Sequence, residues 1–197
     1  MMQRLFETSN SNRALRILLQ LTGIFLNNKE MLEFAINKLS VVTVADKLLS
    51  TSSDPKDAVA ALKFFRTLAF SDDHKDAVWT SMLNGCIPRL RTLTVAPYIS
   101  ELMAELIFGT LAVMALHRRE VPENLWKDQN FSDYCRVTIN KLKGKSLVQL
   151  LQFVRNSVRH KVKVDESIVN EIKEIEGIGR DAQLIADIIR MTELVVE

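Results

Sequence analysis

The chain contains 197 residues, of which 25% are charged and 47% are hydrophobic, a balance typical of a chain that buries a core in water. Its 26 basic and 24 acidic residues give a net charge of +2, which by itself indicates no particular class of partner. Six glycines and four prolines are too few for a β-sandwich or barrel, and the composition also excludes collagenous, disordered, disulfide-rich and membrane-spanning chains.

The amino end and the two cysteines bear on the compartment. Residues 1–9 lack the apolar core of a signal peptide, and the longest apolar stretch, residues 109–116, is far shorter than the ~20 residues that span a bilayer. Cys86 and Cys135 lie 49 positions apart without a CxxC spacing, which suits a reducing compartment. We therefore expect an intracellular chain, cytoplasmic or nuclear, with no membrane insertion.

Helical patterns follow one another along the chain. Residues 12–21 place apolar side chains at i, i+3, i+4 and i+7, which is the stripe of an amphipathic helix. Asp54 and Pro55 read as a helix cap followed by a proline in the first helical position, and Pro88 and Pro97 also read as first-turn prolines. No segment alternates in polarity for long enough to make a strand, so the predicted fold class is all-α.

A nine-residue pattern recurs within these helices. Residues 61–69 and 104–112 lie 43 positions apart and share Ala, Phe, Thr, Leu and Ala at equivalent places. Residues 14–22 align with residues 61–69 at a shift of 47. Periods of about 40–47 residues are typical of stacked repeats of two or three helices, in which each unit buries its apolar face on its neighbour.

The repeated segment resembles an armadillo repeat. In that family a helix of the form A-L-x-x-L-x-N-L-A precedes a short helix and then G-G-I-P-x-L; here residues 61–69 are followed by Asp76-Ala77-Val78 and by Asn-Gly-Cys-Ile-Pro-Arg-Leu at residues 84–90. Gly85 and Pro88 fall on the family's glycine and proline, and Cys86 replaces its second glycine. The resemblance covers about residues 10–116 and implies a right-handed α-solenoid. The expected single domain, 1–197, comprises repeats at about 10–50, 54–95 and 97–142 and a C-terminal helical cap at 144–197.

One helix of each repeat would line the concave groove of such a solenoid. The alignment places three i, i+4 pairs there, each pair on one helix face: Arg16 and Gln20, Lys63 and Thr67, Leu106 and Thr110. Glutamine and threonine replace the family's ladder asparagine, which argues against the way importin-like members hold a peptide backbone. Arg16 and Lys63 either make one end of the groove basic, which suits an acidic or amphipathic peptide or helix, or are simply solvated.

The sequence carries no recognised catalytic motif: HExxH, GxSxG, the P-loop and GxGxxG are all absent. His74, His117 and His160 are each 43 residues apart, so a solenoid would separate them by about 10 Å each, too far to share one metal ion. We therefore predict no enzymatic activity, no cofactor and no metal. The predicted function is that of a protein-interaction scaffold or adaptor within a larger assembly.

Charge is concentrated near the carboxyl end. Residues 136–163 contain eight basic and no acidic residues, and residues 164–197 contain nine acidic and three basic ones. The alternative function is therefore a helical nucleic-acid-binding module. Its basic patch would be Lys141, Lys143, Lys145, Arg155, Arg159 and Lys161. A glycine-rich turn within residues 175–185 resembles a helix-hairpin-helix motif, but Glu176 and Asp181 would repel phosphate, and the preferred interpretation of the turn is a helix stop.

The two charged segments are expected to cover each other. A helix predicted from Ser146 to Lys161 has an apolar stripe that should pack on the preceding repeat; it consists of Leu147, Leu150, Leu151, Val154 and Val158. The following helix, predicted from Glu166 to Glu176, carries Glu171 and Glu174. We expect this acidic helix to lie over the basic one.

Overall fold

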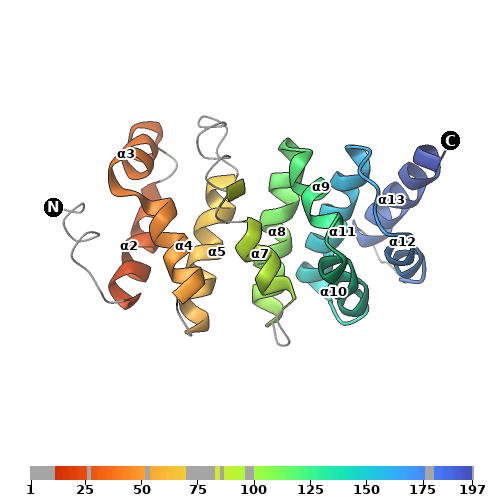
Figure 1. Ribbon diagram of the computed structural model, residues 1–197, viewed down its shortest axis with the longest axis horizontal. Helices are drawn as coiled ribbons and strands as arrows, with labels where there is room; N and C mark the ends of the chain where they lie inside the picture. Colours follow the sequence, from red (N-terminus) through yellow and green to blue (C-terminus); the bar gives the residue numbers. More distant parts are fainter. Residues whose placement is uncertain are drawn as a thin grey trace. The chain divides into compact units, whose positions relative to one another are not determined.

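The computed structural model describes residues 12–25, 28–51, 54–69, 83–84, 87–95, 100–175 and 180–196. In these residues there are helices and no strand, which confirms the all-α fold class (Figure 1). The chain divides into two compact units, Met1–Leu90 and Arg91–Glu197, which we name the amino-terminal and the carboxy-terminal unit. None of the helices in the described ranges is both long enough and apolar enough to cross a membrane.

The amino-terminal unit is built around one pair of long helices. Its elements are α2 (Asn12–Phe25), α3 (Lys29–Leu39), α4 (Val41–Thr51), α5 (Pro55–Ala69) and the start of α7 (Ile87–Thr94). Helix α2 packs against α5, and α4 packs against both of them. The largest buried side chains of this core include Leu15, Leu19, Leu48, Leu62 and Phe65.

Local capping signals set several of these boundaries. The Asn28 side chain accepts a hydrogen bond from the Met31 N–H and begins α3. Ser40 has a φ of 49°, and this left-handed residue separates α3 from α4 without a longer loop. Pro55 is the first residue of α5, and Asp54 accepts a hydrogen bond from the Lys56 N–H at 2.9 Å, as the cap-and-proline pattern predicts. Pro88 lies in the first turn of α7, as predicted, whereas Pro97 lies outside the described residues.

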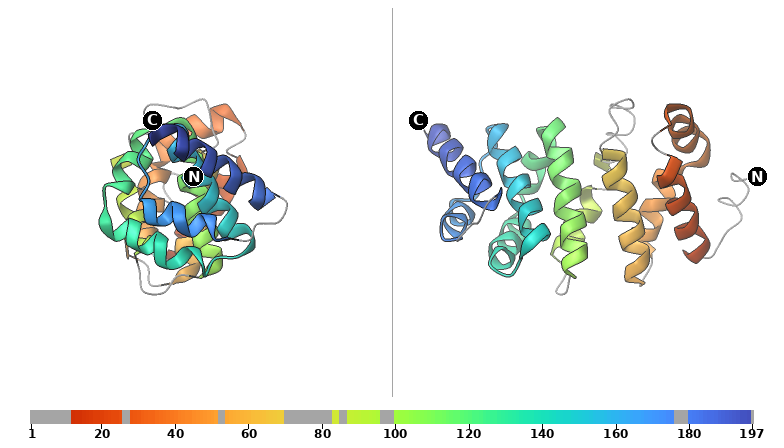
Figure 2. Two further views of the ribbon diagram at one scale, coloured as in Figure 1. Left: turned by 90° about the vertical axis from the view of Figure 1, so that its right-hand side faces the viewer. Right: turned by 180° about the vertical axis from the view of Figure 1, so that it is seen from behind.

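The carboxy-terminal unit is built around a row of three long helices. Its elements are α8 (Glu101–His117), α9 (Glu120–Trp126), α10 (Gln129–Ile139), α11 (Gly144–Arg159), α12 (Glu166–Lys173) and α13 (Arg180–Val196). Helix α11 packs against α8 on one side and α13 on the other, and the right-hand view of Figure 2 shows these three side by side. Helix α10 packs against α9 and α12.

An aromatic cluster joins three elements of this unit. The ring of Phe153 stacks on Trp126 with the centroids 5.4 Å apart, and it meets Phe131 edge-on at 5.9 Å. The Trp126 Nε1–H donates to the Ser157 hydroxyl at 2.9 Å, so the polar atom of the indole has a partner. The cluster therefore fixes α9 and α10 against α11.

The predicted apolar stripe of α11 is confirmed, but the acidic helix that pairs with the basic side of α11 is α13 and not the predicted α12. Leu147, Leu150, Leu151, Val154 and Val158 are all buried, and α11 packs on α8. The Arg155 Nε–H donates to Asp187 of α13 at 3.0 Å, whereas Glu171 of α12 accepts from Asn140 of α10. The expectation that the helix carrying Glu171 and Glu174 covers the basic one is wrong, because α12 packs mainly on α10 and α13.

Candidate functional site

A groove of about 250 Å³ lies between α2 and α5 of the amino-terminal unit, and it gathers three of the six residues predicted to face a partner. Gln20 comes from α2, and Lys63 and Thr67 come from α5. The remaining lining residues are Leu19, Gly23, Ala60 and Phe64. The right-hand view of Figure 2 shows the two helices lying beside each other.

Helical spacing brings these residues onto facing stripes. On α5, Ala60, Lys63, Phe64 and Thr67 follow an i, i+3, i+4, i+7 pattern, which places them on one face. Leu19, Ala60 and Phe64 are buried and form an apolar floor. A Cβ atom placed on Gly23 would meet no other atom within 4 Å, so the missing side chain leaves open space at this point of the groove.

The rim of the groove is polar. Gln20, Lys63 and Thr67 are exposed, and no hydrogen bond or ion pair joins the side chain of Gln20 or Lys63 to another residue in the described part of the chain. The Thr67 hydroxyl donates to the Lys63 carbonyl at 2.9 Å, which leaves its oxygen lone pairs able to accept. The groove thus combines an apolar floor with a glutamine amide, a hydroxyl and one ammonium group.

Arg16 does not make the groove basic, because its charge is used within the chain. Its Nη1 atom lies 2.9 Å from Asp54 Oδ2 and 2.7 Å from Asp57 Oδ1, and the Asp57 side chain is buried. The hydrogen bond to Asp54 is the main cause that raises the pKa of Arg16 above its ordinary value. Hydrogen bonds from the Lys56 N–H and then from Arg16 lower the pKa of Asp54. Of the two predicted cations, Lys63 alone remains available to a partner.

Leu106 and Thr110 also depart from the expectation that they face an open groove. They are 4% and 0% exposed, and the Thr110 hydroxyl donates to the Leu106 carbonyl within α8. Helix α8 buries residues on every side from Ala104 to Ala115, with the sole exception of Glu105, which is half-buried. On such a helix the repeat alignment cannot separate a groove position from a core position.

The basic segment does not form one patch. Lys141, Lys143 and Lys145 lie at the amino end of α11, whereas Arg159 and Lys161 lie at its carboxyl end. The 16 residues of α11 separate the two groups by about 24 Å at a rise of 1.5 Å per residue. Arg155, between them, is paired with Asp187. The predicted basic residues therefore fall into two groups at opposite ends of α11.

The cysteine and histidine residues in the described ranges form no catalytic or metal-binding centre. Burial raises the pKa of the Cys135 thiol, which favours the unreactive protonated form. No group of three or more His, Cys, Asp and Glu side chains there could hold a metal ion. His74, Cys86 and the Gly177–Gly179 turn lie outside the described residues.

Asn156 is a structural residue that the sequence analysis missed. Its Nδ2 donates to the Ala112 carbonyl of α8 at 2.8 Å, and its side chain accepts from Gln152 at 3.1 Å. It is 2% exposed, so it ties α11 to α8 and is not free to hold a peptide. An alignment of residues 150–158 with residues 104–112, at a shift of 46, would have placed Asn156 at the position of Thr110.

Comparison of the chain with protein-family models and with curated proteins finds no match.

Proposed function

We propose that this chain is a non-enzymatic protein-interaction scaffold or adaptor that binds a short peptide or helix of a partner in the groove between α2 and α5. The observation that carries the proposal is the pairing of a buried apolar floor with three exposed polar side chains, of which Gln20 and Lys63 have no side-chain partner in the described structure. Such a surface offers burial to an apolar side chain and hydrogen bonds to the peptide that carries it.

The size of the groove favours a peptide over a metabolite. Small-molecule sites usually enclose about 300–1,000 Å³, and the groove holds about 250 Å³. That volume suits one large apolar side chain resting on Leu19 and Phe64. Gln20 can both donate to and accept from a peptide backbone, because an amide side chain carries both kinds of group.

Charge indicates which peptides fit. Lys63 is the cation of the groove, and Arg16 is occupied by Asp54 and Asp57. A carboxylate near the apolar anchor would therefore find a complementary charge at Lys63. The preferred ligand is an acidic or amphipathic segment, and the single available lysine makes the electrostatic contribution small and sensitive to salt.

The proposal includes an armadillo-like arrangement of the helices. The recurring pattern falls on α2, α5 and α8, which are long helices. Within the amino-terminal unit α2 lies beside α5, and within the carboxy-terminal unit α8, α11 and α13 lie in a row. Rows of one long helix per repeat are what a right-handed solenoid requires. We place the chain inside the cell, as one part of a larger assembly.

A peptide-display selection tests the proposal. Random short peptides would be selected on the wild-type chain and then tested on the triple variant Gln20→Ala, Lys63→Ala, Thr67→Ala. The matched control is Asn37→Ala, Lys38→Ala, which removes two exposed side chains of α3 outside the groove. Selected peptides should carry an apolar anchor beside acidic residues, bind the control as they bind the wild type, and lose affinity for the triple variant at an unchanged Tm. Equal binding to all three proteins would refute the groove as the site.

A further inference from the structure

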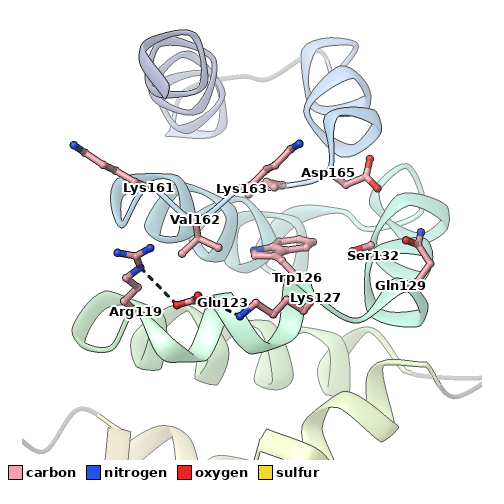
Figure 3. Close-up of a pocket in the computed structure, with 11 residues that line it drawn as sticks. Arg119, Glu123, Trp126, Lys127, Gln129, Ser132, Lys161, Val162, Lys163 and Asp165 are labelled. Atoms are coloured by element: carbon pink, nitrogen blue, oxygen red, sulfur yellow. Dashed lines mark hydrogen bonds and ion pairs between the residues drawn. The ribbon is translucent and has the colours of Figure 1, made fainter. Parts of the chain in front are cut away.

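A second pocket lies wholly within the carboxy-terminal unit and shares no residue with the groove between α2 and α5. It has a volume of about 390 Å³. Figure 3 shows its two walls: one is α9 with the residues beside it and the start of α10, and the other is residues 161–165, which connect α11 to α12. We name this connection the strap.

The backbone of the strap is held in place and carries two exposed lysines. Buried and exposed residues alternate along it: Val162 and Val164 are 7% and 8% exposed, whereas the side chains of Lys161 and Lys163 are exposed. The Lys161 N–H bonds to the Val158 carbonyl at 2.8 Å and the Val162 N–H bonds to the Ser157 carbonyl at 3.1 Å. Lys161 itself has a φ of 56°, a conformation uncommon for a residue other than glycine. The two buried valines therefore anchor a short segment whose two lysines line the pocket, and Figure 3 shows the lysine side chains pointing away from each other.

The pocket has an excess of available positive charge. Its cations are Arg119, Lys127, Lys161 and Lys163, and its anions are Glu123 and Asp165. Glu123 is already shared between Arg119 at 3.7 Å and Lys127 at 3.2 Å, the two contacts drawn in Figure 3.

The second anion is also committed within the chain. The Asp165 carboxylate accepts hydrogen bonds from the Ser167 N–H at 2.8 Å and the Ser167 hydroxyl at 2.6 Å, as the cap of α12. In contrast, no ion pair joins Lys161 or Lys163 to another residue of the described ranges. Both lysines are therefore able to bind an added anion.

An aromatic surface lies between the charged groups. Trp126 lines the pocket and is half-buried, and its ring is held by Phe153, by Phe131 and by the hydrogen bond to Ser157. Because these contacts fix the ring, an apolar side chain that rests on it requires no rearrangement of the chain. Gln129 and Ser132 add neutral polar groups at the same end of the pocket.

We propose that this pocket binds an acidic segment of a partner protein, in which two carboxylates spaced i, i+2 pair with Lys161 and Lys163 and an apolar side chain rests on Trp126. The two lysines are themselves i, i+2 in sequence, so their Cα atoms are at most about 7 Å apart. Their flexible four-carbon stems let the two ammonium groups reach carboxylates two residues apart in an extended peptide. A nucleic acid fits less well, because its phosphates would also approach the carboxylates of Glu123 and Asp165.

Trp126 supplies a direct readout of binding. The chain has two tryptophans, so a Trp79→Phe background leaves Trp126 as the fluorophore. The probe is a capped peptide with Glu-Leu-Glu at the centre of a glycine and serine carrier, and its control replaces both glutamates with glutamine. The acidic peptide should change the fluorescence of Trp126 and bind more weakly as salt is raised, whereas the glutamine peptide should do neither.

A pair of matched variants assigns the effect to the strap. Lys161→Gln, Lys163→Gln should weaken the acidic peptide about tenfold, as expected for the loss of two exposed ion pairs. Lys141→Gln, Lys143→Gln removes two lysines of the same i, i+2 spacing at the other end of α11 and should leave binding within about twofold. If the double variant unfolds, Lys163→Gln alone provides the test. It should lose about half as much binding free energy as is expected for the double variant.

Three results would overturn the proposal. The first is an unchanged Trp126 fluorescence when the acidic peptide is added. The second is an equal loss of peptide affinity in the Lys161, Lys163 variant and in the Lys141, Lys143 variant. The third is tighter binding of inorganic phosphate or of a short single-stranded DNA than of the peptide, through the same lysines. None of these results bears on the groove between α2 and α5, so the two proposals fail separately.

Discussion

Replacing Phe153 by alanine is expected to destabilise the carboxy-terminal unit by about 4 kcal/mol, within the range of about 3–5 kcal/mol for truncation of a buried phenylalanine. The side chain is 0% exposed and contacts both Trp126 and Phe131. Loss of its buried area accounts for roughly 1.5–3 kcal/mol, and the cavity between α9, α10 and α11 accounts for the rest.

Urea denaturation followed by Trp126 fluorescence, in the Trp79→Phe background, measures this loss in the unit that contains the substitution. With an m-value of about 2 kcal/mol/M, a loss of about 4 kcal/mol lowers the midpoint by about 2 M. Lys145→Ala on the same helix is the control, because an exposed substitution should change stability by no more than about 0.5 kcal/mol. A loss below about 1 kcal/mol for Phe153→Ala would show that the aromatic cluster is not packed as described.

Three further predictions each concern one residue. In a variant that keeps Cys135 as the sole thiol, alkylation at pH 8 should be slow in the folded protein and fast in urea, because burial raises the pKa of this thiol; fast labelling of the folded chain would contradict its burial. Asp165→Ala should cost about 1 kcal/mol at pH 7 through the loss of the α12 cap. Hydrogen bonds from Ser167 lower the pKa of Asp165 in the folded state, so the stability that Asp165 contributes is present above about pH 4 and is lost as pH falls through that lowered pKa. The Tm values of wild type and variant should therefore converge in acid. A difference in Tm that stays constant with pH would refute the capping role of the Asp165 carboxylate. Asp187→Ala, which leaves the half-exposed Arg155 unpaired and also removes the contacts of Asp187 with Gln183 and Arg190, should lower stability by about 1 kcal/mol or less, measured by urea denaturation; no change at low salt would show that the Asp187 side chain does not hold α13 on α11.

Local chemistry made much of the fold predictable. The Asp54 cap and Pro55 start α5 because each signal acts within one turn of helix. The stripe of α11 is buried as expected because apolar spacing of 3 and 4 residues fixes one helix face. Which acidic helix covers α11 could not be predicted, because α12 and α13 both offer an apolar stripe and carboxylates, and tertiary packing decides between them.

The candidate groove was only partly predictable. The repeat alignment placed Gln20, Lys63 and Thr67 on the groove-lining faces of two repeat helices, and the structure brings these three together. The same alignment could not detect that Arg16 pairs with Asp54 and Asp57, which lie 38 and 41 residues away in sequence. The pocket on Trp126 was not predicted at all, because its walls come from α9, the start of α10 and the strap, and no periodic pattern links them.

Filling the groove at Gly23 tests the central claim most directly. Gly23 lies inside α2, and a side chain there would extend into open space rather than into the core. Leucine at this position should raise helix stability by up to about 0.8 kcal/mol because glycine is a poor helix former. The affinity of Gly23→Leu for peptides selected on the wild-type chain should be measured by titration beside its Tm. We predict an unchanged or higher Tm together with the loss of peptide binding, whereas undiminished affinity in a folded variant would show that the partner does not occupy the groove between α2 and α5.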